Sequence, residues 1–337
     1  MQAGARLTQS VVALVALVAL VAAACAPAQN LVVRYGQAPS AYKSIYSLPI
    51  AVAQREGLFR REGLDFRIVI PVAGGADRMI AELHDDGFDL AHVATPFLVR
   101  AALGGSDAVA VAAEFNDPIY SLVARPDIAR IADLRGKVVG LADPGGSITY
   151  SMRKLLALHG LSARDIQVKT IEGTPARLGC LRRGECAAVP LGQPQDLLAQ
   201  SQGYRLLGIS NDAVPAYLYT VTAVRRSWAA AHEDAVVRYV RALGAAFRVI
   251  RDPQRRGAVV QAIVELTGVS PAIAEGVLAL YADSGRKVLP EHGEIDLAGL
   301  AQVIAFMGEA GQLKAPLPEP ERFVELRYQR LASHPQQ

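Results

Sequence analysis

Two glycines and two hydroxyl side chains stand at a predicted helix start in the stretch DPGGSIT, residues 143–149. Gly145 and Gly146 would let the backbone approach a bound molecule closely, because glycine has no side chain. Ser147 and Thr149 would place hydroxyl groups beside the unpaired amide N–H groups of the first helical turn. Such a helix start is favourable for an anion. Ser147 would equally serve as an ordinary N-cap, and the sequence leaves both roles open.

Other predicted helix starts and strand ends offer polar groups or rings of the same kind. Loops at the carboxyl ends of parallel strands meet at one edge of a sheet, so we expect these groups to line one ligand-binding cleft. The further candidates are Ser47, Gly74, Gly75, Thr95, Gly192 and Gln193, with the aromatic residues Tyr42, Tyr46, Tyr120 and Tyr217. A tyrosine ring can cover a planar ligand while its hydroxyl binds it, although core packing is the commoner role of such a residue.

The charge of the ligand stays open at this level. Lys43 and Arg78 could neutralise an anion, whereas Asn116 and Asp117 could accept hydrogen bonds from an amine. Arg177 stands in a matching place later in the chain, which favours a role in the fold for both arginines. Trp228 opens a predicted helix on the far side, where we expect a structural role.

Motifs of exported hydrolases and dehydrogenases are absent from the sequence. It contains no GxSxG, GxGxxG, GxxxxGK[ST] or HExxH pattern, and its six histidines are dispersed. We therefore expect no covalent catalysis, no cofactor and no metal.

The N-terminus carries an apolar run of 14 residues after Arg6, closed by small residues before Cys25. This pattern resembles the bacterial lipoprotein signal, except that Ala22 stands where leucine or valine is usual. The resemblance implies a signal peptide over 1–24, a lipid on Cys25 and a tether over 25–29. The alternative is an uncleaved anchor helix.

Cys180 and Cys186 are then the remaining cysteines. An exported chain can oxidise such a pair, but two buried thiols between a helix and the next strand would satisfy the pattern equally well. Their spacing is not CxxC and no histidine is close, so metal binding is not expected.

Composition and periodicity define the fold class. The 337 residues are 51% hydrophobic and 20% charged, with a net charge of +3 and no run of five like charges, so we expect no nucleic-acid partner. Short β-rich runs alternate with amphipathic segments, which predicts an α/β fold with mainly parallel strands. The predicted strands are 30–36, 65–70, 88–93, 107–115, 120–125, 137–141, 165–171, 186–191, 204–209 and 217–224. Helices capped by Ser227, Ser270 and Asp296 follow from about residue 224.

A strand, helix, strand pattern occurs twice, over 63–96 and 160–194. Gly63 and Gly160 are 97 residues apart, and Arg78 and Arg177 are 99 apart. Two related lobes would give this pattern, and so would chance similarity between two ordinary α/β units.

Two segments carry a family resemblance: SLPIAVAQREGLFRREGLDFRIVIPVAGGADRMIAELHDDGFDLAHVATP, and DLRGKVVGLADPGGSITYSMRKLLALHGL. They resemble the substrate-binding proteins of bacterial ABC importers, in the nitrate, sulfonate, taurine and thiamine-pyrimidine-precursor branch. The resemblance implies the type II periplasmic-binding-protein fold: two hinged α/β lobes, with a C-terminal helical segment packed on lobe one. We predict lobe one as 30–121 plus 220–335, and lobe two as 122–219.

The resemblance also implies a function. Such a protein captures a small organic or inorganic solute between its lobes and delivers it to an ABC permease. We expect an anion of the sulfonate, nitrate or carboxylate kind, and a lipid-anchored monomer on the outer face of the cell membrane or in the periplasm. The alternatives are binding of a thiamine-pyrimidine precursor, an enzyme of the same fold, and a membrane-tethered sensor or adhesin without transport.

Overall fold

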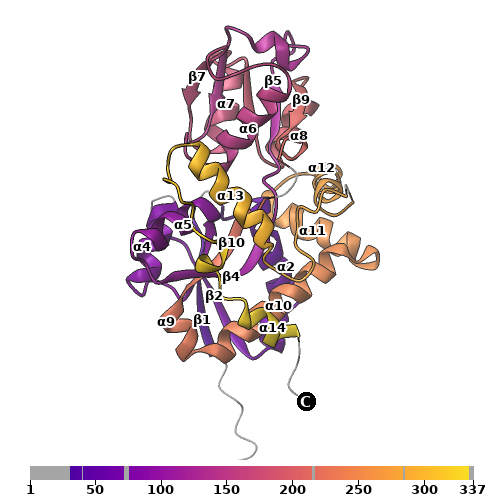
Figure 1. The fold of residues 1–337 in the computed structure, drawn as a ribbon. Coiled ribbons are helices and arrows are strands. Elements are labelled where there is room, and N and C mark those ends of the chain that lie inside the picture. The colour runs from indigo at the N-terminus through magenta and orange to yellow at the C-terminus, as the bar shows by residue number, and fades with distance from the viewer. Residues whose placement is uncertain (1–30, 40, 72–75, 215–216, 284, 334–337) are drawn as a thin grey trace, which may run out of the picture.

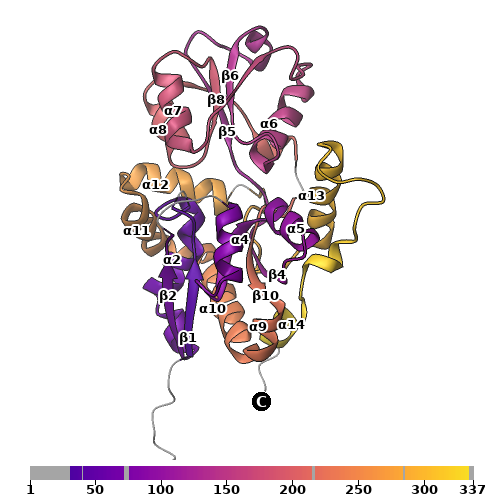
Figure 2. The ribbon, with the colours of Figure 1, turned by 90° about the vertical axis from the view of Figure 1, so that its left-hand side faces the viewer.

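The computed structural model describes residues 31–39, 41–71, 76–214, 217–283 and 285–333. The predictions for Cys25, Gly74 and Gly75 therefore lie outside the described residues. Two lobes, each built around a five-stranded sheet, lie one above the other (Figures 1 and 2).

The sheet of lobe one has the strand order β2-β1-β3-β10-β4. Its strands are β1 (Leu31–Gly36), β2 (Leu64–Val69), β3 (Leu90–Ala94), β4 (Ala108–Phe115) and β10 (Thr220–Arg225). Strand β1 runs parallel to β2 and β3, whereas β10 runs antiparallel to β3 and β4.

The sheet of lobe two has the order β7-β6-β8-β5-β9. Its strands are β5 (Ser121–Ala124), β6 (Val138–Leu141), β7 (Gln167–Thr170), β8 (Ala188–Leu191) and β9 (Arg205–Ile209). Strand β6 is parallel to β7 and β8, and β5 is antiparallel to β8 and β9. Every strand predicted from the sequence is present, and the two-lobed α/β fold is confirmed.

The prediction of mainly parallel strands is wrong, because half of the strand pairings are antiparallel. The reason lies in the connections between the lobes. Strands β5 and β10 each arrive from the other lobe, so they enter their sheets at the edge where the parallel strands end. The predicted lobe boundaries, at 121/122 and 219/220, stay a prediction.

Helices cover both sheets. Between the strands lie α2 (Leu48–Arg55), α3 (Leu58–Arg61), α4 (Ala76–His84), α5 (Thr95–Leu103), α6 (Ser147–Leu158), α7 (Thr174–Arg182) and α8 (Gln195–Ser201), with the 3-10 turns η1 (Ile45–Ser47) and η3 (Ser210–Asp212). After β10 follow α9 (Arg226–Ala231), α10 (Glu233–Arg251), α11 (Arg256–Thr267), α12 (Pro271–Leu278), the π-helical turn η5 (Ala279–Asp283), α13 (Leu297–Glu309) and α14 (Arg327–Ser333).

The C-terminal helices pack on lobe one, as predicted, but they also contact lobe two. Helix α13 rises beside α5 towards α6 in both views (Figures 1 and 2). The rings of Phe306 in α13 and Tyr150 in α6 lie 3.9 Å apart, and Lys154 Nζ lies 2.8 Å from Glu309 Oε2. The segment therefore braces the two lobes together.

Two of the three predicted helix caps are confirmed. Ser270 accepts a hydrogen bond from the Ile273 N–H, and Asp296 accepts one from the Ala298 N–H. The prediction for Ser227 is wrong, because α9 begins at Arg226 and Ser227 is its second residue. The Ser227 N–H instead donates to Asp107 Oδ2 at 2.8 Å. A carboxylate from outside the local sequence thus replaces the expected hydroxyl cap.

The repeated sequence pattern corresponds to β2–α4–β3 in lobe one and β7–α7–β8 in lobe two. In each unit the two strands flank a central parallel strand, β1 or β6. Gly63 and Gly160 precede the units with φ values of 70° and 73°, a backbone conformation that favours glycine. The two glycines therefore serve the same turn in both lobes.

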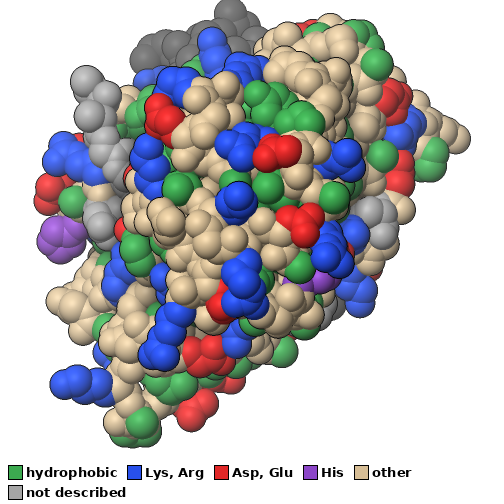
Figure 3. Space-filling model, turned by 90° about the horizontal axis from the view of Figure 1, so that it is seen from above, with side chains coloured by type: hydrophobic (Ala, Val, Ile, Leu, Met, Phe, Trp, Pro, Cys, Tyr) green, Lys and Arg blue, Asp and Glu red, His purple; other side chains and the backbone are tan. Residues whose placement is uncertain are grey.

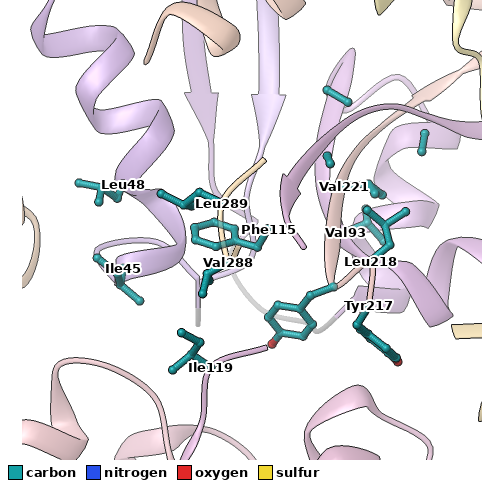
Figure 4. Close-up of a cluster of buried hydrophobic side chains, with 14 of the residues drawn as sticks. Ile45, Leu48, Val93, Phe115, Ile119, Tyr217, Leu218, Val221, Val288 and Leu289 are labelled. Carbon is teal, nitrogen blue, oxygen red and sulfur yellow. The ribbon is translucent and has the colours of Figure 1, made fainter. Parts of the chain in front are cut away.

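Buried apolar residues form a core that reaches through both lobes. Figure 4 shows part of it in lobe one, where Phe115 at the end of β4 lies beside Val288 and Leu289. The core of lobe one also encloses the carboxylate of Glu114. It accepts hydrogen bonds from the Tyr35 hydroxyl at 2.8 Å and the Thr222 hydroxyl at 2.7 Å, and lies 2.6 Å from His92 Nδ1. Both oxygens of this buried side chain therefore have polar partners.

The surface carries mixed charge. Seen from the lobe-two end, basic and acidic side chains are interspersed (Figure 3). Among the described helices, none is alone both long and apolar enough to cross a bilayer; the pair Pro253–Thr267 and Pro271–Asp283 reaches that length together, with a bend of 112°.

Cys180 in α7 and Cys186, just before β8, are joined by a disulfide in the structure. The bond lies in a small apolar cluster of lobe two with Val123, Val189 and Leu191. It closes the turn between the helix and the strand.

Replacing both cysteines by serine should lower the free energy of unfolding by about 2 kcal/mol, because the bond restricts a short loop in the unfolded chain. Urea unfolding of the oxidised protein and of the double variant measures this difference. Equal stabilities, with no change in the parent on adding a reductant, would favour two free thiols in the folded protein.

Candidate functional site

The ends of the parallel strands converge at the boundary between the lobes. Gln37 follows β1, Thr95 follows β3, and Asn116 follows β4 on the lobe-one side. Across the boundary, Ala142 follows β6 and Gly192 follows β8. The chain crosses this boundary twice, from β4 to β5 and from β9 to β10, so any group bound here touches both lobes.

A cluster of tyrosines occupies the boundary. The ring of Tyr46, in η1, lies 6.2 Å from that of Tyr120 and 5.6 Å from that of Tyr219. The hydroxyls of Tyr120 and Tyr219 are 3.3 Å apart. The Tyr46 hydroxyl is buried and has no hydrogen-bond partner. Burial, with the neighbouring Tyr120 and Tyr219, raises the pKa of Tyr46 well above its usual value, so the hydroxyl keeps its proton and can donate it.

A chain of hydrogen bonds connects this cluster to lobe two. The hydroxyl of Tyr281, in η5, donates to Gln193 Oε1 at 2.8 Å. Gln193 Nε2 and the Ser121 hydroxyl in turn donate to Asp196 Oδ2, at 2.8 and 2.6 Å. Burial raises the pKa of Asp196, whereas the hydrogen bonds from Ser121 and Gln193 favour its ionised form. Gln193 thus joins the C-terminal helices to the buried carboxyl of lobe two.

Gly192 lies at the centre of the cluster, closely approached by three side chains. A Cβ atom placed on it would lie 3.3 Å from the Tyr120 ring, 3.6 Å from Thr174 Oγ1 and 3.7 Å from the Tyr46 hydroxyl. The absence of a side chain on Gly192 thus lets all three groups come close to its backbone. Of the sequence candidates, the structure brings Tyr46, Tyr120, Gly192 and Gln193 together here.

The hydroxyls predicted to bind a ligand are engaged within the protein. Ser47 donates to the Ala41 carbonyl at 2.9 Å, Thr95 to the Tyr219 carbonyl at 3.2 Å and Thr149 to the Ala142 carbonyl at 2.9 Å. The Tyr217 hydroxyl donates to Ser147 Oγ at 2.9 Å. None of the four accepts from its own helix start. Ser47 stands at the N-cap position of α2 without a capping hydrogen bond, whereas Ser147 is the first residue of α6 and Gly146 its N-cap, so the N-cap alternative for Ser147 is wrong. Each hydroxyl oxygen can still accept a further hydrogen bond.

The glycine pair that opens α6 lies against the C-terminal segment. Gln312 Nε2 donates to the Gly145 carbonyl at 3.1 Å, and Arg100 Nη1 donates to Gln312 Oε1 at 3.2 Å. Gly146 is the N-cap of α6, and its own N–H donates to the Asp143 carbonyl. These contacts place Gly145 beneath Gln312.

The charged candidates on lobe one make local contacts. Lys43 lies over the Tyr42 ring at 5.7 Å and both are exposed, beside a cavity of about 260 Å³ that Gln37 also lines. Arg78 forms an ion pair with Glu82 one helical turn away. Trp228, in α9, stacks on His232, which follows that helix, in keeping with a structural role.

Three boundary residues are missing from the sequence candidates: Thr174, Tyr219 and Tyr281. Thr174 opens α7 after a glycine with φ of 78°, and this glycine-threonine helix start was a usable signal. Tyr281 lies in a turn that reads as ordinary helix, so only the fold shows its position. Among the described residues, no three His, Cys, Asp or Glu side chains gather closely enough to hold a metal ion.

Asn116 and Asp117 lie in the first crossing between the lobes. Asp117 is buried, and its Oδ1 atom has no hydrogen-bond partner. Burial raises its pKa to about 8, against the opposing effect of a hydrogen bond from the Asn211 side chain. At neutral pH this carboxyl is therefore mostly protonated, which makes it a poor acceptor for an ammonium group.

A model of the NMT1/THI5-like protein family matches residues 44–255, more than half of the chain. Solved structures with the same fold include the alkanesulfonate-binding protein SsuA of Xanthomonas axonopodis pv. citri bound to MOPS, with a TM-score of 0.69 and 19% identity over 88% of this chain and 98% of that one. The periplasmic nitrate-binding protein NrtA of Synechocystis PCC 6803 gives 0.70 and 14% over 90% and 89%. The desulfurization enzyme DszB gives 0.66 and 15% over 90% and 99%. No curated protein matches the sequence.

Stability should fall as the pH rises from about 4 to about 8 because of Asp117. Its carboxyl keeps a proton in the folded state that the unfolded chain releases near pH 4, and this costs up to about 1.4 kcal/mol per pH unit in that window. Asp117→Asn should remove this slope and stabilise the protein at pH 8 more than at pH 5, as measured by urea unfolding at both values.

Asp127→Asn is the matched control, because Asp127 is exposed and paired with Arg125, which lowers its pKa. Its effect on stability should not change between pH 5 and 8. If Asp117→Asn showed the same pH slope as the parent, Asp117 would be ionised in the folded protein.

Proposed function

Because the chain belongs to the NMT1/THI5-like family, we propose that it is an extracytoplasmic solute-binding protein of an ABC importer. It captures a small solute between its lobes and delivers it to a membrane permease. The solute is an anion of the sulfonate, nitrate or carboxylate kind. SsuA and NrtA, which share the fold, are named for an alkanesulfonate and nitrate, and this likeness supports the choice.

One observation carries the proposal: the Tyr46 hydroxyl, from lobe one, is buried without a partner beside Gly192 of lobe two. A buried polar group without a hydrogen bond destabilises a protein by about 1–3 kcal/mol. A solute placed between the lobes would supply that bond. It would also touch both lobes at once, and only such a ligand can favour the state in which they meet.

The remaining parts of the proposal concern location and partners. The leader over 1–24 would direct export and be removed, and the lipid on Cys25 would then hold a monomer by its tether at the outer face of the membrane, beside the permease. The alternative of a membrane-tethered sensor uses the same cleft and differs only in lacking the permease.

We propose binding without covalent chemistry. The groups that surround Gly192 are phenol and threonine hydroxyls, which bind a solute through hydrogen bonds. DszB shows that the fold also supports an enzyme, and a thiamine-pyrimidine precursor is a second candidate ligand. Release of a chemically altered solute would contradict the binding proposal.

The first test screens residues 26–337 by thermal shift against sulfonates, nitrate, carboxylates, pyrimidines and amino acids. A ligand at 100 times its Kd should stabilise the protein by about 2.7 kcal/mol, a clear rise in Tm. A hit among the anions would support the proposal. A hit among the pyrimidines would support the alternative of a thiamine-pyrimidine precursor. If no member of the panel raises the Tm, the importer function is contradicted.

Gly192→Val should weaken binding of the solute that scores best in this screen by tenfold or more, which corresponds to at least about 1.4 kcal/mol. Its side chain would press on Tyr120, Thr174 and the Tyr46 hydroxyl and displace the groups proposed to hold the solute. Gly257→Val in α11, where no atom lies within 4 Å of the added Cβ, is the matched control and should bind normally. Calorimetric titration of both variants decides; equal affinities would place the site elsewhere.

A further inference from the structure

We propose that Arg177 is the residue that selects an acid group on the solute, as its counter-ion from lobe two. This inference rests on the proposed solute-binding function and adds the residue that sets the charge preference. The solute it predicts has one sulfonate or carboxylate group near Thr174 and Gly192 and a body that lies against the rings of Tyr46 and Tyr120.

Arg177 is a buried cation held only by neutral acceptors. Its side chain, in α7, is 1% exposed. The guanidinium donates from Nε to the Pro190 carbonyl at 2.7 Å, from Nη1 to the Ile171 carbonyl at 3.1 Å and from Nη2 to Thr174 Oγ1 at 3.1 Å. These contacts use three of its five N–H groups. The guanidinium is thus fixed in place with donors to spare.

No carboxylate in the described part of the chain lies within 4 Å of this guanidinium, unlike most other arginines there. Burial of a charge without an opposite charge carries an energetic penalty of several kcal/mol. Carbonyl dipoles offset part of that penalty, and an anion brought by the solute would offset the rest. The free protein therefore holds a positive charge ready for an acid group.

The internal repeat has an arginine in both lobes, but only that of lobe two is buried. Arg78 occupies the corresponding helix, α4, in lobe one. Its side chain is 56% exposed and pairs with Glu82. The same residue type in the same structural unit is thus a solvated surface residue in one lobe and a buried, unpaired cation in the other. The sequence comparison, which favoured one fold role for both, is wrong on this point.

Arg177 also lies close to the tyrosine cluster at the boundary between the lobes. Its Cζ atom is 5.9 Å from the centroid of the Tyr120 ring, which in turn faces Tyr46 across the boundary. Thr174, which holds Nη2, is one of the side chains that approach Gly192. A guanidinium prefers the two-oxygen geometry of a carboxylate or sulfonate. The buried charge and the aromatic rings beside it therefore fit a ligand that has both an acid group and an apolar body.

The test compares acids with neutral compounds of nearly the same shape: benzenesulfonate against benzenesulfonamide, and benzoate against benzamide, with methanesulfonate and nitrate as smaller anions. Each is titrated calorimetrically into the parent chain 26–337 and into Arg177→Gln, Arg177→Lys and the matched control Arg78→Gln. We expect at least one acid to bind the parent tenfold or more tightly than its amide.

In Arg177→Gln that preference should disappear, with acid affinity reduced by about ten- to one-hundred-fold, the range for hydrogen bonds to a charged group. Arg177→Lys, which keeps the charge but not the fork of donors, should lose a smaller part of it. Arg78→Gln should bind as the parent does. If Arg177→Gln fails to fold, the lysine variant decides, because unchanged acid affinity in it would overturn the role of the guanidinium fork.

Other results separate this inference from the importer function. Amides that bind as tightly as the acids, or a solute hit confined to uncharged compounds, would overturn the role of Arg177 and leave the solute-binding function standing. Acid binding that persists in Arg177→Gln would do the same. The absence of any hit in the acid panel and in the wider solute screen would overturn both.

Discussion

One inner strand of each sheet begins directly after the chain has crossed from the other lobe. Strand β10 lies between β3 and β4, and β5 lies between β8 and β9. The sheet of lobe two is one continuous stretch, from β5 to β9, whereas the sheet of lobe one is complete only when the chain returns as β10. This arrangement also fixes where chemistry can take place, because both sets of parallel strands end where the crossing segments pass. The tyrosines, Gly192 and Gln193 meet at the boundary for that reason.

Hydrogen bonding distinguishes the buried carboxyl of lobe one from two polar groups at the boundary. Glu114 lies near the end of β4, the edge strand of its sheet, and each of its oxygens has a partner. The Tyr46 hydroxyl and Asp117 Oδ1, in contrast, are buried near the crossings without one. Native proteins keep few such atoms, and those that persist have a reason outside the stability of the fold. A solute bound as proposed would supply the missing hydrogen bond of Tyr46.

Local sequence predicted the strands well, because buried strands appear as short β-branched runs between turn residues. It predicted their directions less well, since direction depends on which lobe a strand comes from. The fate of Ser147 shows a second limit: its hydroxyl is taken by Tyr217, 70 residues away, and no local pattern carries that information. Arg177 shows a third, because burial and the absence of a carboxylate are properties of the fold and not of a motif.

The brace formed by α13 has a mechanical consequence. If the two crossing segments were the only connections, bending of those segments alone would let the lobes separate. The contact of Phe306 with Tyr150 and the ion pair of Lys154 with Glu309 add a third attachment to one side. Any separation of the two lobes would have to break these contacts as well as bend the crossings. A partner that binds α13 would therefore act on the boundary between the lobes from outside it.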